Sequence, residues 1–504
     1  MINISINRGE AHTLFDEHYI IQRSYVVRCL LKSYLIRVSG EISLKGGWRR
    51  RLEKILENNM RVAVDNKCVV KRIDWGRFYL ECQDDLSKIL TKIFGVHEIL
   101  ETKHLELKDL KSLGEKIRDI YCEDVRDKKF AVEVKRVGQH NFTSRDVAIV
   151  TGDMLRECGG KVDLENPDIK IYVEIRGYDV YVSDDKKRFR GVGGFPISSS
   201  EKVLVLFSGG FDSTVATWML MRKGCPTDLL YINMGSLDNM IRSLEVAEKL
   251  FREWGHGYSP RIFIADFSEV IREIRSIIKP VYWQIAVKRM MYILAKEIAS
   301  KYGYKALASG DSIWEANSQT ITNLRVSEDS LNMTVLRPVI GMTKDDIIKI
   351  SIDIGLYDLI TKVKETCWLG ASPPIKINQE KFMREFNKLN KDLINKVLEK
   401  IITIDLEENW REKLEKLYEV NVSIDHLPEN SVIIDLTKKL VKKRSVGGLE
   451  IHDLGEIDLF KERDIMLVCE EGETSELLAK ELRLRGFRAY SLRGGLKKLQ
   501  EIIK

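Results

Sequence analysis

The chain has 504 residues, which is too long for one hydrophobic core and predicts about three or four domains. Its composition is globular, with 44% hydrophobic and 31% charged residues, only 9 prolines and no low-complexity tract. The net charge of +6 permits a polyanionic partner without requiring one, because many basic surfaces are only solvated.

Several features of the sequence predict a cytoplasmic protein. No apolar run reaches the roughly 18 residues of a transmembrane helix, and the N-terminus lacks the pattern of a signal peptide. The 8 cysteines have no framework spacing and fit a reducing compartment better than a disulfide scaffold. Without a Cys-x-x-Cys pair or a His/Cys cluster, neither a structural zinc nor an iron–sulfur cluster is expected.

The N-terminal half predicts two small α+β domains. No role is assigned to an extension at residues 1–33. Residues 34–83 alternate strands and helices in the order of a ferredoxin-like unit, with a further helix expected at 86–94. A second unit of helices and alternating strands spans residues 84–186. The polar, cationic stretch at 187–199 is interpreted as a linker.

The C-terminal half predicts two α/β domains. Short apolar runs alternate with helix-length patterns over residues 200–375, which predicts a doubly wound parallel sheet with ligands at the carboxyl ends of its strands. Residues 376–418 are charged and predict a helical linker, and residues 419–504 predict a last α/β unit. The expected fold class is therefore multidomain α/β.

The most informative segment is Ser208–Ser213, with the sequence Ser-Gly-Gly-Phe-Asp-Ser between an apolar strand and a helix. Gly209 and Gly210 let backbone N–H groups approach a phosphate, and the helix dipole favours negative charge there. The Gly-Lys-Ser/Thr ending of a Walker loop is missing. Asp212 and Ser213 fit a metal–phosphate group, although a plain helix cap is the alternative.

Two other polar clusters follow later strands of this domain. Ser309–Ser312 and Asn317–Thr320 lie at a strand end, where such loops often only satisfy their own backbone. In Gly341–Asp346, Thr343 can cap a helix and leaves Lys344 in its first turn, where a cation opposes the dipole. This position predicts that Lys344 meets an anion, with a solvated lysine as the alternative.

Two cysteines stand apart from the others. Cys469 ends an apolar strand and begins an acidic loop before a helix that opens at Ser475, where a thiolate is stabilised and becomes nucleophilic. A half-buried strand cysteine is the alternative. Cys367 closes the nucleotide-binding domain, and by itself its position favours a structural role. The remaining cysteines are interpreted as structural: Cys29, Cys68, Cys82, Cys122, Cys158 and Cys225.

Residues 34–504 resemble the tRNA 4-thiouridine synthetase (ThiI-type) family, in the form with THUMP, PP-loop and C-terminal rhodanese-like domains. Besides Ser208–Ser213 and the Cys469 loop, the resemblance rests on Gly40–Gly46, Phe130–Arg136, Asn141–Ser144, Asp163–Asp168, Gly193–Pro196, Ser318–Thr320, Leu336–Gly341 with Lys344, the strand that carries Asp435, and Ser491–Gly495.

The resemblance implies an ATP-dependent tRNA sulfurtransferase that makes 4-thiouridine, expected at the eighth nucleotide of tRNA. Uridine O4 would be adenylated with the help of Asp212 and Lys344, a Cys469 persulfide would deliver sulfur, and Cys367 would resolve the intermediate as a disulfide. The implied ATP contacts are Leu206, Phe207, Ser208, Gly209, Gly210, Ser213, Tyr231, Ile232, Lys288, Gly310 and Gln319.

The implied cofactors are ATP and Mg²⁺, with Mg²⁺ carried by ATP rather than by a fixed protein site. The implied partners are tRNA, a disulfide reductant, and a cysteine desulfurase or other persulfide donor, because the acidic loop would repel thiosulfate. No membrane partner is expected, and a homodimer is left open. Candidate tRNA-binding residues, which would contact phosphates rather than bases, are Lys135, Arg136, Lys186, Lys187 and Arg188.

The sequence departs from the family pattern at two places. Where the family usually has Gly-Glu-Ser-Leu-Gly-Gln, this chain has Asp311, Trp314 and Glu315, and Lys288 stands where an Arg is usual. Three alternatives stay open: a PP-loop thiolase for another tRNA base, an ATP-dependent amidotransferase or ligase, and a non-catalytic RNA-binding or sulfur-carrier protein that serves thiamine thiazole synthesis.

Overall fold

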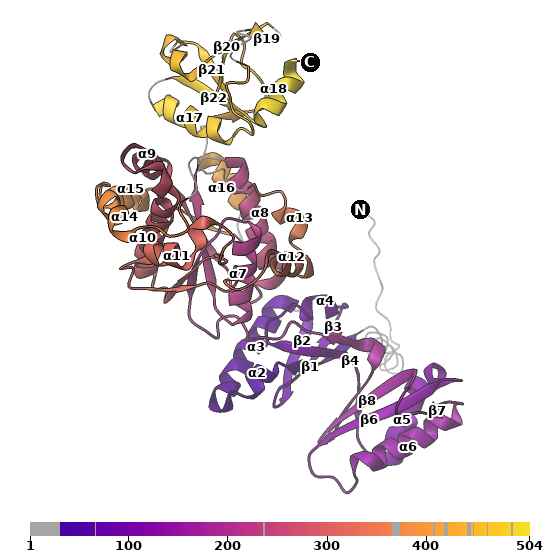
Figure 1. Cartoon of the computed structure of the whole chain (residues 1–504). Coiled ribbons are helices and arrows are strands. Elements are labelled where there is room, and N and C mark those ends of the chain that lie inside the picture. Colours follow the sequence, from indigo (N-terminus) through magenta and orange to yellow (C-terminus); the bar gives the residue numbers. More distant parts are fainter. Residues whose placement is uncertain are drawn as a thin grey trace, which may run out of the picture. The chain divides into compact units, whose positions relative to one another are not determined.

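The computed structural model divides the chain into two compact units, Met1–Ser199 and Ser200–Lys504 (Figure 1). In the described part of the chain, no helix combines the length and the apolar character that crossing a membrane requires. The residues that the structure describes are 31–65, 67–234, 237–364, 373–406, 409–417, 422–440, 445–446, 448–460, 462–484 and 487–503.

The first unit opens with a five-stranded antiparallel sheet in the order β10-β4-β1-β3-β2. Alternation along its central strand decides the packing, because Tyr34 and Ile36 enter the core under the helices while Leu35 faces the opposite side. The elements are β1 (Lys32–Val38), α3 (Arg49–Val64), β2 (Cys68–Asp74), β3 (Arg77–Cys82), α4 (Ser87–Leu90), β4 (Val96–Glu101) and β10 (Arg188–Arg190).

This sheet extends beyond the residue-83 limit expected from the sequence, because β4 and β10 also belong to it. The helix expected at 86–94 is only the single turn α4. The interpretation of 187–199 as a linker is wrong for its first residues, since β10 pairs with β4 and Phe189 packs against the core. A three-residue strand with polar neighbours has no periodicity that the sequence could reveal.

The second sheet of this unit has the order β5-β9-β8-β6-β7 and is covered by α5 and α6 (Figure 1). Thr143 caps α6 in a capping box with Asp146. The helices and alternating strands expected for residues 84–186 are present. They are β5 (Lys103–Glu106), α5 (Leu110–Val125), β6 (Lys129–Val137), α6 (Ser144–Glu157), β7 (Lys161–Val162), β8 (Ile169–Arg176) and β9 (Asp179–Asp184).

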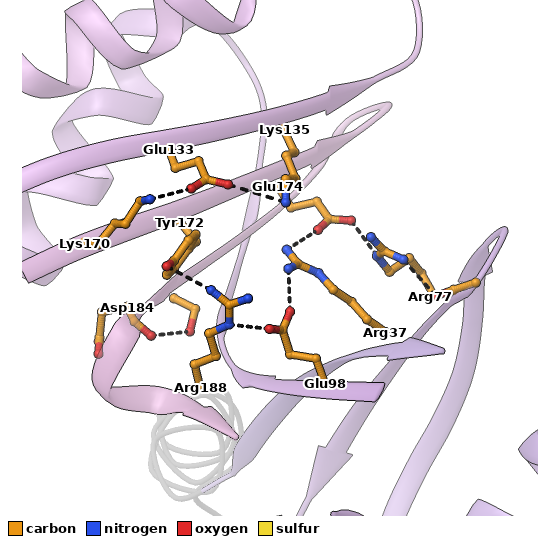
Figure 2. Close-up of polar contacts among 12 residues, drawn as sticks. Arg37, Arg77, Glu98, Glu133, Lys135, Lys170, Tyr172, Glu174, Asp184 and Arg188 are labelled. Atoms are coloured by element: carbon orange, nitrogen blue, oxygen red, sulfur yellow. Dashed lines mark hydrogen bonds and ion pairs between the residues drawn. The ribbon is translucent and has the colours of Figure 1, made fainter. Parts of the chain in front are cut away.

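A buried charge network fastens the two sheets of the first unit to each other (Figure 2). The guanidinium of Arg37 pairs with Glu98 at 2.5 Å and with Glu174 at 2.9 Å, and Arg77 also reaches Glu174 at 2.9 Å. Burial would raise the pKa of Glu174, but Arg77, Arg176 and Arg37 outweigh it and lower the pKa to about 2. Each buried carboxylate of this network is therefore paired with arginines of the same unit and stays charged.

Four of the six cysteines interpreted as structural form two disulfides, although the sequence fits a reducing compartment better than a disulfide scaffold; Cys29 lies outside the described residues. Cys68 on β2 lies opposite Cys82 on β3 and is bonded to it, and Cys122 at α5 is bonded to Cys158 at the end of α6. Strand register and helix packing bring the two cysteines of each pair together, so the spacing of the cysteines in the sequence does not predict the disulfides. Among the described residues Cys225 and Cys469 are free and buried.

The second unit begins with a six-stranded sheet in the order β15-β14-β11-β12-β13-β16, which is parallel except for β16. Helices cover both faces: α10 packs against Leu204 and Leu230, while α7 and α12 share a core at Val215 and Ile347. The elements are β11 (Val203–Leu206), α7 (Phe211–Arg222), β12 (Thr227–Asn233), α8 (Leu237–Trp254), β13 (Arg261–Asp266), α10 (Trp283–Tyr302), β14 (Ala306–Ala308), β15 (Thr334–Leu336) and α12 (Lys344–Asp353).

The doubly wound parallel sheet expected for residues 200–375 is thus confirmed. The expectation of an entirely helical segment at 376–418 is wrong at β16 (Ile402–Asp405), which adds antiparallel to β13. Ile404 is buried in this pairing, so contact with β13 decides the conformation of a short segment with no strong preference of its own. The helices of this segment are α14 (Gln379–Phe386), α15 (Leu393–Glu399) and α16 (Trp410–Leu417).

The last domain has a sheet in the order β17-β22-β21-β18-β20-β19, parallel except at β19. Ile434 and Leu467 face one core, and Ile433 and Val468 face the other, because successive strand residues alternate. The last α/β unit was expected here. Its main elements are β17 (Ser423–Ile424), β18 (Val432–Asp435), β19 (Ser445–Val446), β20 (Leu449–His452), β21 (Asp464–Val468), α17 (Glu473–Leu484), β22 (Arg488–Leu492) and α18 (Gly495–Ile503).

Candidate active site

The loop Ser208–Ser213 joins β11 to α7, as the sequence predicts. Ser213 Oγ accepts the N–H of Ser208 at 3.2 Å, and Ser208 Oγ accepts the N–H of Gly210 at 3.4 Å. Gly209 has φ +77°, and a Cβ on it would lie 2.6 Å from the Cα of Ser243. Only glycine fits there, so the loop is held tightly in front of the α7 N-terminus.

Gly310, predicted as an ATP contact, lies against this loop. A Cβ on Gly310 would lie 2.5 Å from the backbone nitrogen of Ser213 and 2.6 Å from the carbonyl carbon of Asp212. The segment after β14 therefore reaches the first turn of α7 through backbone contact alone. Two of the predicted clusters, 208–213 and 309–312, are brought together at the carboxyl end of the sheet.

Lys344 meets carboxylates of its own chain. Thr343 caps α12 in a capping box with Asp346, and Lys344 is the first residue of the helix. Its Nζ lies 3.0 and 3.1 Å from the two carboxylate oxygens of Asp212 and 2.6 Å from Oε1 of Glu315. Burial would lower the pKa of Lys344, but hydrogen bonds to Glu315 and Asp212 raise it.

Lys288 is likewise paired within the protein. It lies on α10 and forms a short ion pair with Asp311, which also accepts hydrogen bonds from Tyr292 at 2.9 Å and Ser309 at 2.8 Å. Burial would raise the pKa of Asp311, but Lys288, Ser309 and Arg337 hold it below its ordinary value. Asp311, Tyr292 and Glu315 were not predicted as site residues; only the departures at 311 and 315 pointed to them.

The other predicted ATP contacts lie around the same sheet edge. Leu206 ends β11 and Phe207 follows it, and Tyr231 and Ile232 are buried near the end of β12. Gln319 lies in a short 3₁₀ turn after β14, and its buried Oε1 accepts no hydrogen bond from the described residues. A buried oxygen without a hydrogen bond can accept one from a donor group of a bound ligand.

Cys469 lies in a cradle of donors between β21 and α17. Its Sγ is 3.1 Å from the backbone nitrogen of Gly472 and 3.4 Å from that of Ser475, and the Ser475 hydroxyl is 3.3 Å away. A Cβ on Gly495 would lie 2.3 Å from the carbonyl oxygen of Cys469, so the segment after β22 closes tightly on the loop. The thiol is 8% exposed. Backbone and hydroxyl donors therefore surround this sulfur before α17, and the role of Cys469 as a nucleophile stays a prediction.

The acidic residues after Cys469 are paired with lysines. Glu470 pairs with Lys439 at 2.5 Å, and Glu471 pairs with Lys364 at 3.0 Å. Asn239 on α8 accepts the Lys364 N–H at 2.9 Å. Cys367, three positions after Lys364, lies outside the described residues, so its pairing with Cys469 stays a prediction. A cavity of about 170 Å³ lies beside these contacts, lined among others by Asn239, Arg242, Lys364, Glu471, Gly472 and Arg493.

Most of the predicted tRNA-binding residues make contacts within the protein. Lys135 pairs with Glu133 at 3.4 Å, and Lys187 pairs with Asp184 at 3.5 Å. Arg188 contacts Glu98 and the hydroxyl of Tyr172 (Figure 2). Arg136 donates to the carbonyl of Gly138 at 3.1 Å, and Lys186 is exposed.

A groove that the sequence did not predict runs along α6 and β7. Its volume is about 1180 Å³. Basic, acidic and exposed apolar side chains line it together, and Arg156 pairs with Asp153 at 3.5 Å. The remaining basic and apolar side chains suit the phosphates and the bases of a nucleic acid. The basic and apolar side chains that line the groove include Arg145, Ile149, Arg156, Lys161, Val162 and Leu164.

Comparisons with known proteins identify the family. Residues 33–99 match the ThiI ferredoxin-like domain, 107–185 the THUMP domain, and 198–391 the thiamine biosynthesis protein ThiI. The tRNA sulfurtransferase of Desulfurococcus amylolyticus is 38% identical, and the alignment covers 92% of this chain and 98% of that protein. The chain belongs to the ThiI family of tRNA sulfurtransferases.

Further tRNA sulfurtransferases are similar to this chain over nearly its whole length. The tRNA sulfurtransferase of Pyrobaculum aerophilum is 35% identical over 91% of this chain and 96% of its own length, and that of Escherichia coli is 32% identical over 90% and 98%. A crystal structure of a 4-thiouridine synthetase–RNA complex with bound ATP covers 74% of this chain and 99% of its own, at 25% identity and a TM-score of 0.64. The predicted family and enzyme class are confirmed.

Proposed function

We propose that this ThiI-type enzyme makes 4-thiouridine in tRNA by adenylating uridine O4 and then transferring sulfur from a persulfide on Cys469. The contact of Lys344 with Asp212 at the glycine loop carries the proposal, because it puts a cation and a carboxylate beside a preformed anion site. The similar 4-thiouridine synthetase, crystallised with RNA and ATP, supports the same reaction.

The activation step uses the loop after β11. Backbone N–H groups of the loop and the N-terminus of α7 would receive the ATP phosphates, and Lys344 would stabilise the charge on the departing pyrophosphate. Uridine O4 attacks the α-phosphate, the bond to the β-phosphate breaks, and pyrophosphate leaves. Gln319 offers its unpartnered oxygen to a donor such as the amino group of adenine.

In this proposal Mg²⁺ is carried by ATP rather than by a fixed protein site. The described residues hold no group of three or more acidic, His or Cys side chains arranged for a metal ion, and the Asp212 carboxylate is already paired with Lys344. We place Mg²⁺ on the ATP phosphates in this proposal and assign no step to a bound metal.

The sulfur step uses the Cys469 cradle. The outer sulfur of the persulfide attacks C4 of the activated uridine, and the Cys367 thiolate then attacks Sγ of Cys469. The sulfur–sulfur bond breaks, its electron pair stays on the sulfur bound to C4, and AMP leaves as the C4=S bond forms. A Cys367–Cys469 disulfide remains, and an external reductant must supply two electrons to reset it. The ion pair of Lys364 with Glu471 supports this step, since Lys364 precedes Cys367 by three positions in the sequence and Glu471 lies in the Cys469 loop.

The proposed partners are tRNA and a protein that donates the persulfide. tRNA would be held by the first unit, where the groove along α6 and β7 offers basic and apolar side chains. The persulfide would come from a protein donor such as a cysteine desulfurase, as the family resemblance implies. The matched ThiI model also names thiamine biosynthesis, for which the Cys469 loop would suffice as a sulfur carrier.

Nucleoside mass spectrometry tests the proposal. Purified protein, unmodified tRNA, ATP, cysteine and a desulfurase should yield 4-thiouridine, and omission of ATP should abolish it. A thiolated base other than uridine would indicate a thiolase of different specificity. No thiolated nucleoside from a protein that still becomes persulfidated would leave only the sulfur-carrier role.

A further inference from the structure

The loop after β14 is tied to the turn in front of α12. Ser312 Oγ donates to the carbonyl of Met342 at 3.0 Å, and the N–H of Ile313 donates to the carbonyl of Ile340 at 3.1 Å. These bonds hold residues 310–315 beside the start of α12. Glu315 and Lys344 therefore meet because two anchored segments present them to each other.

The backbone of this loop is unusual at the position before Glu315. Trp314 has φ +71° and a side chain that is 64% exposed. A bulky residue in the left-handed region is strained, and no burial of the indole compensates for it. The loop keeps this conformation nevertheless, and Glu315 then makes the shortest contact of the Lys344 ammonium.

Two carboxylates face the ammonium of Lys344. Its Nζ contacts both Asp212 and Glu315, so Glu315 adds a second negative charge beside this lysine. The first turn of α12 also disfavours a cation, so the ammonium depends on these carboxylates for its position. Asp212 already accepts hydrogen bonds from the Lys344 ammonium with both carboxylate oxygens. Glu315 is therefore an additional acceptor, and its effect on the ammonium can be tested separately.

We propose that Glu315 is a positioning residue that fixes the Lys344 ammonium beside Asp212 and makes this site selective for ATP whose charge is neutralised by a divalent cation. The proposal rests on the proposed role of Lys344 and Asp212 in adenylation. Glu315 acts in two ways: it orients the ammonium toward the α7 N-terminus, and its negative charge opposes a bare triphosphate.

Glu315→Gln separates these two effects from a structural role. The amide can still accept a hydrogen bond from Lys344 but carries no charge, so ATP should bind more tightly while the less firmly held ammonium slows the chemistry. We expect the Kd of ATP in EDTA to fall about three- to ten-fold, and kcat of tRNA-dependent pyrophosphate release to fall by a similar factor. With Mg²⁺ present the change in Kd should be smaller.

Asp345→Asn is the matched control. It removes one negative charge from the residue next to Lys344. The Asp345 side chain is exposed, whereas the ammonium contacts Asp212 and Glu315. Its Kd and kcat should stay within about two-fold of the wild type, since an exposed charge is well screened. Unfolding midpoints of all three proteins should agree, because Glu315 is itself near the surface.

The outcomes separate this proposal from the proposed function. Unchanged ATP affinity in EDTA, weaker affinity, or equal effects in Glu315→Gln and Asp345→Asn would overturn the role of Glu315. Tighter binding with an unchanged kcat would overturn its positioning role. If the wild type binds ATP but releases no pyrophosphate with tRNA, the proposed function fails, while the ATP titrations still decide the charge effect.

Discussion

Two loops of the second unit share one construction and differ in which anion they serve. Each follows a parallel strand and precedes a helix, and in each a serine hydroxyl folds back onto the loop. In 208–213 the acceptor for a loop N–H is a neutral hydroxyl, and the charged groups nearby are Asp212 and Lys344. In the Cys469 loop, two backbone N–H groups already point at the sulfur.

The difference teaches how one local structure supports two steps of a reaction. The first loop leaves its helix N-terminus for an anion that comes from outside, and a lysine from another helix completes the site. The second loop surrounds the sulfur of Cys469, so its backbone donors face an atom of the chain itself. Removing the anion-bearing group of each loop should therefore stop different chemistry.

The largest effect is expected for Cys469→Ala. The variant has no sulfur to carry, so turnover to 4-thiouridine should fall below detection with a desulfurase and cysteine as the donor, measured by nucleoside mass spectrometry. Cys225→Ala is the control, because Cys225 is also buried and free but lies outside both loops. Normal turnover by Cys469→Ala with the protein donor would remove the sulfur role from this loop.

Asp212→Ala should impair the proposed adenylation step rather than sulfur transfer. It removes the carboxylate beside Lys344, and we expect tRNA-dependent pyrophosphate release to fall by about 10²-fold or more, as for other groups that organise charge at a reacting phosphate. Affinity for tRNA, measured by filter binding, should stay within about two-fold. Asp212→Asn keeps the shape and loses the charge, and should be impaired nearly as much. Normal pyrophosphate release by a folded Asp212→Ala variant would refute the assignment of the 208–213 loop.

Glu174 differs from the two loops because the charges that it contacts all belong to side chains of the first unit. Its pKa of about 2 lies below the ordinary 4.5, so its stabilising effect is present above pH 4.5 and is lost as the pH falls toward 2. The shift corresponds to roughly 3 kcal/mol, and Glu174→Gln should destabilise the first unit by that order at neutral pH. Chemical denaturation at neutral and acidic pH would show the loss, and the exposed Glu165→Gln should show none. An unchanged wild-type stability between pH 5 and pH 2.5 would contradict this reading.

The smallest effect concerns the contact between the two cysteine-bearing segments. Lys364 and Glu471 are 44% and 58% exposed, and such a pair is worth about 0.2–1 kcal/mol. Glu471→Lys should slow formation of the Cys367–Cys469 disulfide by about two- to five-fold, and the swap with Lys364→Glu should restore it. Mass spectrometry of non-reduced peptides gives the rate. Equal rates in the wild type and Glu471→Lys would show that the ion pair does not help the segments meet.

Both loops could be predicted from local sequence because strand, turn and helix N-terminus follow each other directly. The Thr343 cap and the cradle of Cys469 were found in the same way. Their partners could not be, because Glu315 reaches Lys344 across 29 positions and Asp311 reaches Lys288 across 23. Strands β10 and β16 and the disulfides likewise depend on pairing with distant segments, which no local pattern encodes.

The central claim is that the 208–213 loop activates the tRNA before the Cys469 loop supplies sulfur. Transfer of label to tRNA from ATP radiolabelled in its α-phosphate tests it most directly. In Cys469→Ala the activated uridine cannot be consumed, so AMP label should accumulate on tRNA, and none should appear with Asp212→Ala. Absence of label from tRNA in Cys469→Ala, while the wild type forms 4-thiouridine, would contradict the account.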